Sequence, residues 1–186
     1  MGAQAGARAD PVMSVKTVMK DAGMAVMRAV GPQLEADEQD LLDTLKEEHD
    51  EVRTLLSDLA DAGTPARRKA LVQSIKAALV PHTKAEEKVL YSAIIALRAK
   101  NAQIDGHEGN IEHALAAQTL EKLGSIAKPT SAEHRATAKV LKELVEHHIR
   151  EEESNIWKDA REHFSSEERI AMNRRYLRAK AQVKIR

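Results

Sequence analysis

The sequence predicts an all-α protein: an up-down-up-down four-helix bundle with additional N- and C-terminal helices. Composition is the first indication, because the 186 residues are rich in helix-forming residues and only 2% are aromatic. Strands rely on aromatic and β-branched side chains, so a β-sandwich or barrel is disfavoured. The second indication is a series of helix-start signals with short connections between them, which makes consecutive helices antiparallel neighbours.

The first segment, residues 1–36, is expected to be an N-terminal extension with an amphipathic helix. Apolar residues recur at helical spacing from Val12 to Ala29, and Lys16 and Lys20 lie on the other side. Three interpretations of this helix stay open. It docks on its own bundle or on a second copy to form a homodimer, it is a mobile extension, or it binds a membrane surface. We favour docking.

The second segment, residues 37–163, is expected to form the bundle. Thr64 before Pro65, and Asp105 and Thr130 each three residues before a Glu, mark helix starts. Pro81 lies inside the second helix and should kink or restart it. The four helices are expected at residues 37–62, 65–99, 107–125 and 131–163.

The last segment, residues 164–186, is expected to form a basic C-terminal helix over residues 166–183. Ser165 and Glu168 carry the capping-box signature at its start. The segment has a net charge of +5, whereas residues 34–163 have a net charge of −7. An acidic body with few aromatic residues is a poor nucleic-acid binder and could host cations, so no nucleic-acid partner is expected.

Several classes of protein are excluded by what the sequence lacks. Without cysteine, there is no Fe–S cluster, thiolate zinc site or cysteine nucleophile. No stretch approaches the roughly 18 uninterrupted apolar residues of a membrane span. The apolar run at residues 22–27 is too short for the core of a secretory signal. A cytoplasmic location follows by default, and a membrane is not an expected partner.

An internal repeat connects the second and fourth predicted helices. Residues 79–91 and 145–157 share the pattern His-x-x-x-Glu-Glu-x-x-apolar-aromatic, and the two motif histidines are 66 residues apart. That spacing corresponds to one helical hairpin. The bundle is therefore expected to consist of two related hairpins with pseudo-twofold symmetry.

Histidines and glutamates interrupt the apolar stripes of these helices. Buried glutamates without partners would cost several kcal/mol each, or would have to be neutral. A metal ion removes that conflict, and imidazole and carboxylate ligands suit iron, manganese or zinc. The candidate ligands are His49, His82, Glu86, His113, His148 and Glu152.

The order of these six residues on four helices resembles the hemerythrin-like, or HHE cation-binding, domain family over about residues 38–163. The resemblance implies that Glu86 and Glu152 bridge two non-haem iron ions, with an oxo or hydroxo bridge, and that the four histidines are terminal ligands. Animal oxygen carriers have a further histidine four residues from the equivalent of His113. Here those positions hold Gly109 and Ala117, so this sequence departs from the pattern for reversible oxygen carriage.

The function that this resemblance implies is a diiron protein that binds or reacts with oxygen, peroxide or nitric oxide in a stress response. An apolar bundle around an open coordination position should admit a small diatomic molecule or peroxide and little else. Two alternatives stay open: oxygen or nitric oxide binding or sensing without turnover, and iron storage or donation. Whether the protein is an enzyme stays open too.

Two further histidines compete for a place in the metal site. His147 precedes His148, but its helical face carries charged and polar residues, so we choose His148. His107 is about 120° away from the face of His113, so we expect it to be exposed at a helix start, with a fifth ligand as the alternative.

The remaining residues near the motifs are expected to have structural roles. Tyr91 and Trp157 should pack in the core or at the bundle end rather than take part in redox chemistry. Asp50, Glu87 and Glu153 should be solvated, with the alternative that one of them orients an imidazole.

Overall fold

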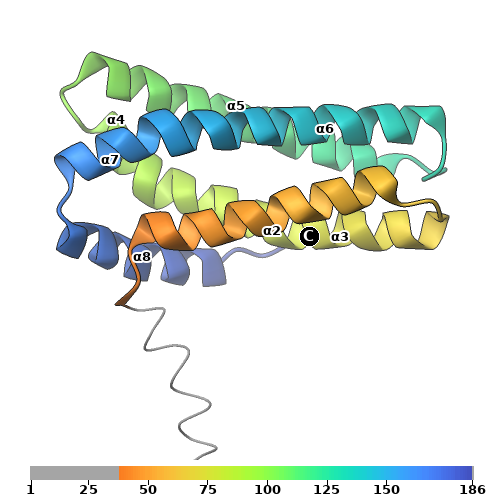
Figure 1. Cartoon of the computed structure of the whole chain (residues 1–186), viewed down its shortest axis with the longest axis horizontal. Coiled ribbons are helices and arrows are strands. Elements are labelled where there is room, and N and C mark those ends of the chain that lie inside the picture. The colour runs from red at the N-terminus through yellow and green to blue at the C-terminus, as the bar shows by residue number, and fades with distance from the viewer. Residues whose placement is uncertain (1–37, 186) are drawn as a thin grey trace, which may run out of the picture. The chain divides into compact units, whose positions relative to one another are not determined.

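The computed structural model describes residues 38–185, and every secondary-structure element among them is helical, so the predicted all-α bundle is confirmed. The elements are α2 (Leu41–Asp61), α3 (Pro65–Glu86), η1 (Glu87–Tyr91), α4 (Ser92–Ile95), α5 (Lys100–Ser125), α6 (Ala132–Glu151), η2 (Glu152–Ile156), α7 (Trp157–His163) and α8 (Ser166–Ala181). The π-helical turns η1 and η2 join α3 to α4 and α6 to α7 without a break. The first hairpin is α2 with α3, and the second is α5 with α6 (Figure 1).

Two of the predicted helix caps are confirmed. The Thr64 hydroxyl accepts a hydrogen bond from the Arg67 backbone N–H, with Pro65 in the first turn of α3. Ser165 and Glu168 form the complete capping box of α8. Both caps depend on residues within one turn of each other, which is why local sequence was sufficient to find them.

Two other predicted starts are wrong. The cap of α6 is Ser131 rather than Thr130, since the Ser131 hydroxyl accepts from the His134 N–H. The third helix starts at Lys100, about two turns before the predicted start at residue 107, and it has no side-chain cap. Its extra turns pack closely on α4, where a Cβ added to Gly106 would lie 2.8 Å from a carbon of Ile95. Tertiary packing therefore outweighs the local capping signal at this end.

Pro81 does not restart its helix. The α3 helix continues through the buried Pro81 as far as Glu86. A proline in a helix interior removes one backbone hydrogen bond, at a cost of about 3 kcal/mol in an isolated helix. Packing of α3 against α2, α5 and α8 offsets that cost, and the irregular turn η1 comes after the metal motif instead.

The core consists of two apolar clusters separated by a polar layer. Burying one of these aliphatic side chains contributes about 1.5–3 kcal/mol, so both clusters stabilise the bundle substantially. The first cluster includes Leu41, Leu45, Leu90, Ile94, Trp157 and Tyr176. The second includes Leu56, Leu59, Ile75, Leu79, Leu120 and Leu141. The four long helices cross from one cluster to the other and so pass through the polar layer.

The C-terminal helix α8 packs against α2, α3 and η1 at one end of the bundle (Figure 1). Met172, Tyr176 and Ala179 point inward and join the first apolar cluster. The amphipathic helix expected in residues 1–36, and the homodimer contact assigned to it, lie outside the described residues. Among residues 38–185, no helix combines the length and apolar character that a membrane crossing requires.

Candidate metal centre

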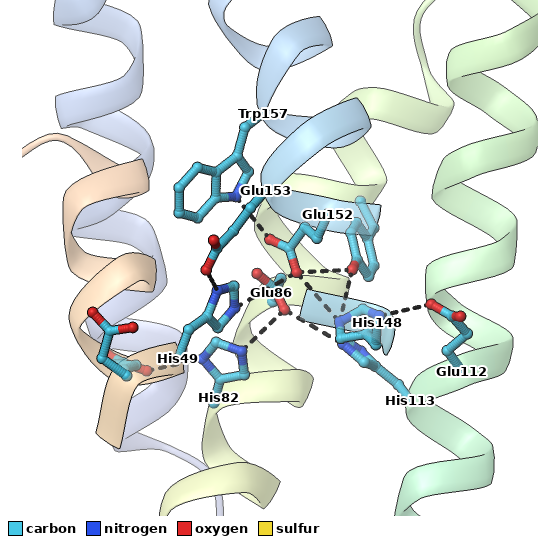
Figure 2. A network of polar contacts seen from close by, with 12 residues as sticks. His49, His82, Glu86, Glu112, His113, His148, Glu152, Glu153 and Trp157 are labelled. Atoms are coloured by element: carbon cyan, nitrogen blue, oxygen red, sulfur yellow. Dashed lines mark hydrogen bonds and ion pairs between the residues drawn. The ribbon is translucent and has the colours of Figure 1, made fainter. Parts of the chain in front are cut away.

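Six side chains from four helices point into the polar layer between the two apolar clusters. All six are buried, and Figure 2 shows them converging on one small region. Each takes the place of an apolar residue in its stripe: His49, for example, lies between Leu45 and Val52 on α2. The structure brings together every residue of the predicted set, namely His49, His82, Glu86, His113, His148 and Glu152.

Glu86 lies between two pairs of histidines. Its Oε2 is 3.3 Å from Nε2 of His82 and 3.4 Å from Nε2 of His113, which come from different hairpins. Glu86 is 0% exposed, and neither of its oxygens has a hydrogen-bond donor. A buried carboxylate in that state is costly unless a cation compensates its charge. Glu86 thus has the position expected of a bridging metal ligand, and its charge is not compensated by a hydrogen bond.

Glu152 repeats this geometry from the second hairpin. Its Oε2 is 3.7 Å from Nε2 of His49 and 3.3 Å from Nε2 of His148. Each glutamate therefore faces one histidine of its own hairpin and one of the other. We name the two histidine pairs half-site 1, which is His49 with His82, and half-site 2, which is His113 with His148.

A carboxylate also lies beside the Nδ1 atom of every one of these histidines. The pairs join different helices: Glu153 with His49 (3.1 Å), Glu48 with His82 (3.0 Å), Glu87 with His113 (3.4 Å) and Glu112 with His148 (2.8 Å). Because an ionised carboxylate only accepts hydrogen bonds, His49, His82 and His148 direct an Nδ1–H outward and leave Nε2 for the centre, while the longer His113–Glu87 contact is an ion-pair contact without a hydrogen bond. This arrangement orients the rings and raises their basicity, as metal-ligating histidines require.

The sequence did not predict that these outer carboxylates contact the histidines. The expectation that Glu87 and Glu153 are solvated is wrong, because each is partly buried against a histidine of another helix. Glu48 and Glu112 were not identified at all. The only indication in the sequence was that each of these glutamates directly precedes a predicted histidine. Its side chain therefore points about 100° around the helix from that histidine, toward the neighbouring helix. Asp50 is exposed, as expected.

Two aromatic residues hold Glu152. The Trp157 Nε1–H donates to Oε1 at 3.1 Å, and the Tyr91 hydroxyl donates to Oε2 at 3.3 Å. Both residues are buried as predicted, but the sequence analysis did not find these hydrogen bonds. An α-helix would turn Trp157 about 140° away from a residue five positions earlier, whereas a π-turn stacks the two. The π-turn η2 therefore brings Trp157 onto the face of Glu152.

Gly109 makes room for Tyr91. A Cβ at Gly109 would lie 2.7 Å from Cζ of the Tyr91 ring, closer than real contacts allow. The tyrosine thus occupies space beside His148 that a larger residue at position 109 would fill, and its hydroxyl is 3.4 Å from the His148 Nε2. Burial, together with the negative charge of Glu152, raises the pKa of Tyr91, so the hydroxyl stays a neutral donor.

Half-site 1 has an additional cover from α8. The Tyr176 hydroxyl donates to Glu48 at 2.6 Å, and Lys180 pairs with the same carboxylate at 2.8 Å. Glu48 in turn accepts from His82. On the other histidine of this half-site, Arg53 pairs with Glu153 at 3.0 Å. Both outer carboxylates of half-site 1 are thus neutralised by basic side chains.

The electrostatics of the centre favour bound cations or protons. Burial lowers the pKa of His82, but the Glu86 and Glu48 carboxylates outweigh burial and raise it to about 10. Burial also lowers the pKa of His148, but Glu112 and Glu152 outweigh burial and raise it to about 9. Without a metal, protons on these imidazoles neutralise the carboxylates. The donor set therefore suits a metal ion that replaces those protons.

The other histidines are not among the converging side chains, although the Nε2 of His147 lies 3.4 Å from the outer carboxylate Glu112. His147 is exposed, as is His107, while His163 lies at the surface end of α7. His134 is buried at the far end of the bundle, where its Nδ1 accepts from the Arg68 guanidinium, so its role is structural. Of these two neighbours, His148 is buried and His147 is exposed, so the predicted set contains the buried one.

A very small, mainly apolar cavity adjoins both half-sites on the side of the second apolar cluster. Val52, Leu79, Ala116 and Val145 line it together with the four imidazoles, and Thr83 and Glu112 also contribute to its lining. A space of this size suits a small uncharged molecule rather than a larger organic substrate.

Comparison with known proteins agrees with a metal-binding role for this bundle. The family model described as "Hemerythrin HHE cation binding domain" matches residues 40–160. A curated relative, a DNA nickase of Nostoc sp. (strain PCC 7120 / SAG 25.82 / UTEX 2576), is 27% identical over 172 residues, which cover 90% of this chain and 48% of the relative. The chain thus spans about half the length of that relative. No solved structure matches the chain.

Proposed function

Because the chain belongs to the hemerythrin HHE cation-binding domain family, we propose that it is a non-haem diiron protein that binds or reacts with oxygen, peroxide or nitric oxide in a stress response. Family membership and the clustered His and Glu side chains support metal binding as such. The pair of irons, the six ligands and the reaction are our proposal. The observation that carries it is Glu86, a fully buried carboxylate without a donor between two histidine pairs.

In this proposal the side chains hold two ions side by side. The Nε2 atoms of each half-site would hold one ion, and Glu86 and Glu152 would contribute carboxylate oxygens to both. A ferrous pair supplies electrons and open coordination positions to a small ligand. The outer carboxylates that accept an Nδ1–H keep those imidazoles in the tautomer with a free Nε2. The apolar clusters exclude bulk water, and the Tyr91 hydroxyl provides a neutral hydrogen-bond donor beside His148.

Reaction is favoured over reversible carriage. The position of a further histidine is taken by Gly109, and Tyr91 fills the space next to it. The donor set gives both proposed ions the same number of histidines. The two ions would therefore have similar open positions, rather than a single open position on one of them. Carriage or sensing without turnover, and iron storage or donation, are the alternative forms of the proposal.

Metal analysis and rapid mixing test the proposal together. The full chain, purified after iron supplementation, should contain about two irons. The reduced protein is then mixed with oxygen, peroxide or nitric oxide and followed by its absorption spectrum. Turnover supports an enzyme, an adduct that reverses under vacuum supports carriage, and rapid iron loss to a chelator supports iron handling. Near-zero iron after supplementation contradicts the proposal in all its forms.

A second candidate function is an action on DNA, although no nucleic-acid partner was expected. The printed name of the relative favours it, since the match covers 90% of this chain. The exposed side of α8 carries Arg174, Arg175 and Arg178, the residue type that pairs with phosphates. Conversion of supercoiled plasmid to open circles by the metal-loaded chain, lost in the Arg175→Gln/Arg178→Gln variant, would favour this function. Intact plasmid would exclude nicking.

A further inference from the structure

A second cavity connects the surface to half-site 2. It is a narrow cleft, partly open to solvent, that lies between α5 and the junction of α6 with η2. Glu108, Glu151 and Asn155 on its lining are exposed, whereas His148 and Glu152 at its inner end are 7% and 1% exposed. The cavity therefore spans the distance from solvent to two of the proposed ligands. We call it the acidic passage.

The lining of the acidic passage is strongly negative. Its carboxylates are Asp105, Glu108, Glu112 and Glu151 in addition to Glu152, and none of its lining residues is a Lys or Arg. Glu112 is the inner one of the four and pairs with His148. Burial, together with the charges of Asp159 and Glu151, raises the pKa of Asp105, which reflects like charges without a basic neighbour.

The approach to half-site 1 has the opposite character. Tyr176 and Lys180 of α8 cover the Glu48 side, and Arg53 covers the Glu153 side. Two positive side chains at that position repel an approaching cation, and the Tyr176 ring covers the Glu48 side. At half-site 2, Lys84 pairs with the outer carboxylate Glu87 at 2.8 Å on the His113 side, whereas the lining of the passage on the His148 side contains no Lys or Arg. Within residues 38–185, the electrostatic preference for a cation thus lies on the His148 side of half-site 2.

We infer that the acidic passage is the route by which a divalent metal ion, supplied as hydrated Fe²⁺, reaches the buried centre. The inference rests on the proposed function, because it assigns a path to the metal site of that function. Carboxylates are suitable for this task because hard divalent cations exchange water for carboxylate oxygens. Asp105 and Glu108 attract the ion by their negative charge. The ion then passes Glu112 and Glu151, and it binds at Glu152 and His148.

The inference predicts how fast metal binds rather than how much. Asp105 and Glu108 contact none of the six proposed ligands, so their removal leaves the binding site itself unchanged. Negative charges that focus a cation into a cleft raise association rates by about 10- to 1,000-fold, and salt weakens the effect. Loading of the unmodified chain should therefore slow markedly as ionic strength rises.

The test measures loading of the metal-free full chain with Fe²⁺ under anaerobic conditions, with Co²⁺ as a coloured substitute. The Asp105→Asn/Glu108→Gln variant should load about tenfold more slowly at low salt and reach the same final stoichiometry. The matched control is Glu121→Gln/Glu143→Gln, which makes the same change in net charge with exposed residues on α5 and α6 that do not line the passage. Its loading rate should stay within twofold of the unmodified chain.

Each outcome has a distinct meaning. A passage variant that loads as fast as the control overturns the passage and leaves the proposed function intact. An unmodified chain that binds neither metal overturns both. Glu108→Lys places a positive charge in the passage and should slow loading beyond the neutral variant. A loading rate in the unmodified chain that does not respond to salt contradicts the inference without any mutation.

Discussion

The two half-sites are built from related sequences but differ in what surrounds them. Each has two histidines and two outer carboxylates that occupy equivalent places in the repeat. Half-site 1 is covered by Tyr176 and Lys180 of α8, which lies outside the repeat. Half-site 2 has the acidic passage instead. The repeat therefore supplies the candidate ligands, and the elements added to it control access.

The two glutamates proposed to bridge the metal ions differ in a second way. Glu152 accepts hydrogen bonds from both Tyr91 and Trp157, whereas Glu86 accepts none and only faces the Nε2 atoms of His82 and His113. Symmetry would give one aromatic donor to each glutamate. Two hydrogen bonds therefore fix the orientation of Glu152, while Glu86 has only its charge interaction with the imidazoles or with a bound cation. Mutations can test both the difference between the two glutamates and the difference between the two half-sites.

The largest effect is expected from removing either glutamate. Glu86→Ala and Glu152→Ala should each reduce iron from about two ions per chain to at most one, because each half-site loses a shared oxygen ligand. Iron is measured by elemental analysis of the purified chain. Glu51→Ala, an exposed position on α2, is the control and should keep both ions. Two irons in either glutamate variant would disprove bridging.

Removal of one histidine should empty half-site 2 alone. His148→Ala is expected to lose about one iron per chain, because the buried Nε2 beside Glu152 is missing. His147→Ala should keep the full content, since that side chain is exposed. The neighbouring residues make this a matched pair for elemental analysis. If His147→Ala lost iron and His148→Ala kept it, the assignment would be reversed.

Metal binding should release protons, and its affinity should rise with pH. In the metal-free chain the pKa values of His82 and His148 are raised to about 10 and about 9, above about 6.5 when unfolded. Protonation of these groups therefore stabilises the metal-free fold fully below about pH 6.5, and that contribution is lost as the pH rises through 9 to 10.

The same protons compete with the metal. At pH 7.5 both His82 and His148 are protonated in the metal-free chain, so Co²⁺ binding should release about two protons per chain, and affinity should rise about tenfold per pH unit for each proton released. An indicator dye in weak buffer measures the release, and His147→Ala should release as many protons as the unmodified chain. Binding that leaves the dye unchanged would show that the metal-free histidines are already neutral.

The smallest effect is expected from two tyrosine hydroxyls, one for each half-site. Tyr176→Phe removes the donor to Glu48 and should weaken half-site 1, whereas Tyr91→Phe removes a donor to Glu152 and should act at half-site 2. Each change should lower the free energy of unfolding of the metal-free chain by about 1 kcal/mol. Denaturant unfolding and two-step Co²⁺ titration measure both effects. Identical titration changes in the two variants would contradict the separation into half-sites.

Prediction from sequence was most accurate where a feature depends on residues close together in the chain. The capping box at Ser165 and the cap at Thr64 are each formed within one helical turn. His82 and Glu86 were found because they interrupt one apolar stripe. The failures follow the same rule: α5 starts two turns early because Gly106 packs against α4, a neighbour that capping signals do not include.

By itself the sequence determined that the chain is helical, where most helices lie and which six polar residues share their buried faces. These properties follow from spacing along a single helix, where 100° per residue fixes which side chains lie together. Only the tertiary structure decided which carboxylate supports which histidine, how the π-turns bring Tyr91 and Trp157 to Glu152, and that α8 covers half-site 1 while half-site 2 has the acidic passage. Those contacts join different helices or depend on a local departure from α-helical geometry, and neither is encoded in the periodicity of one segment.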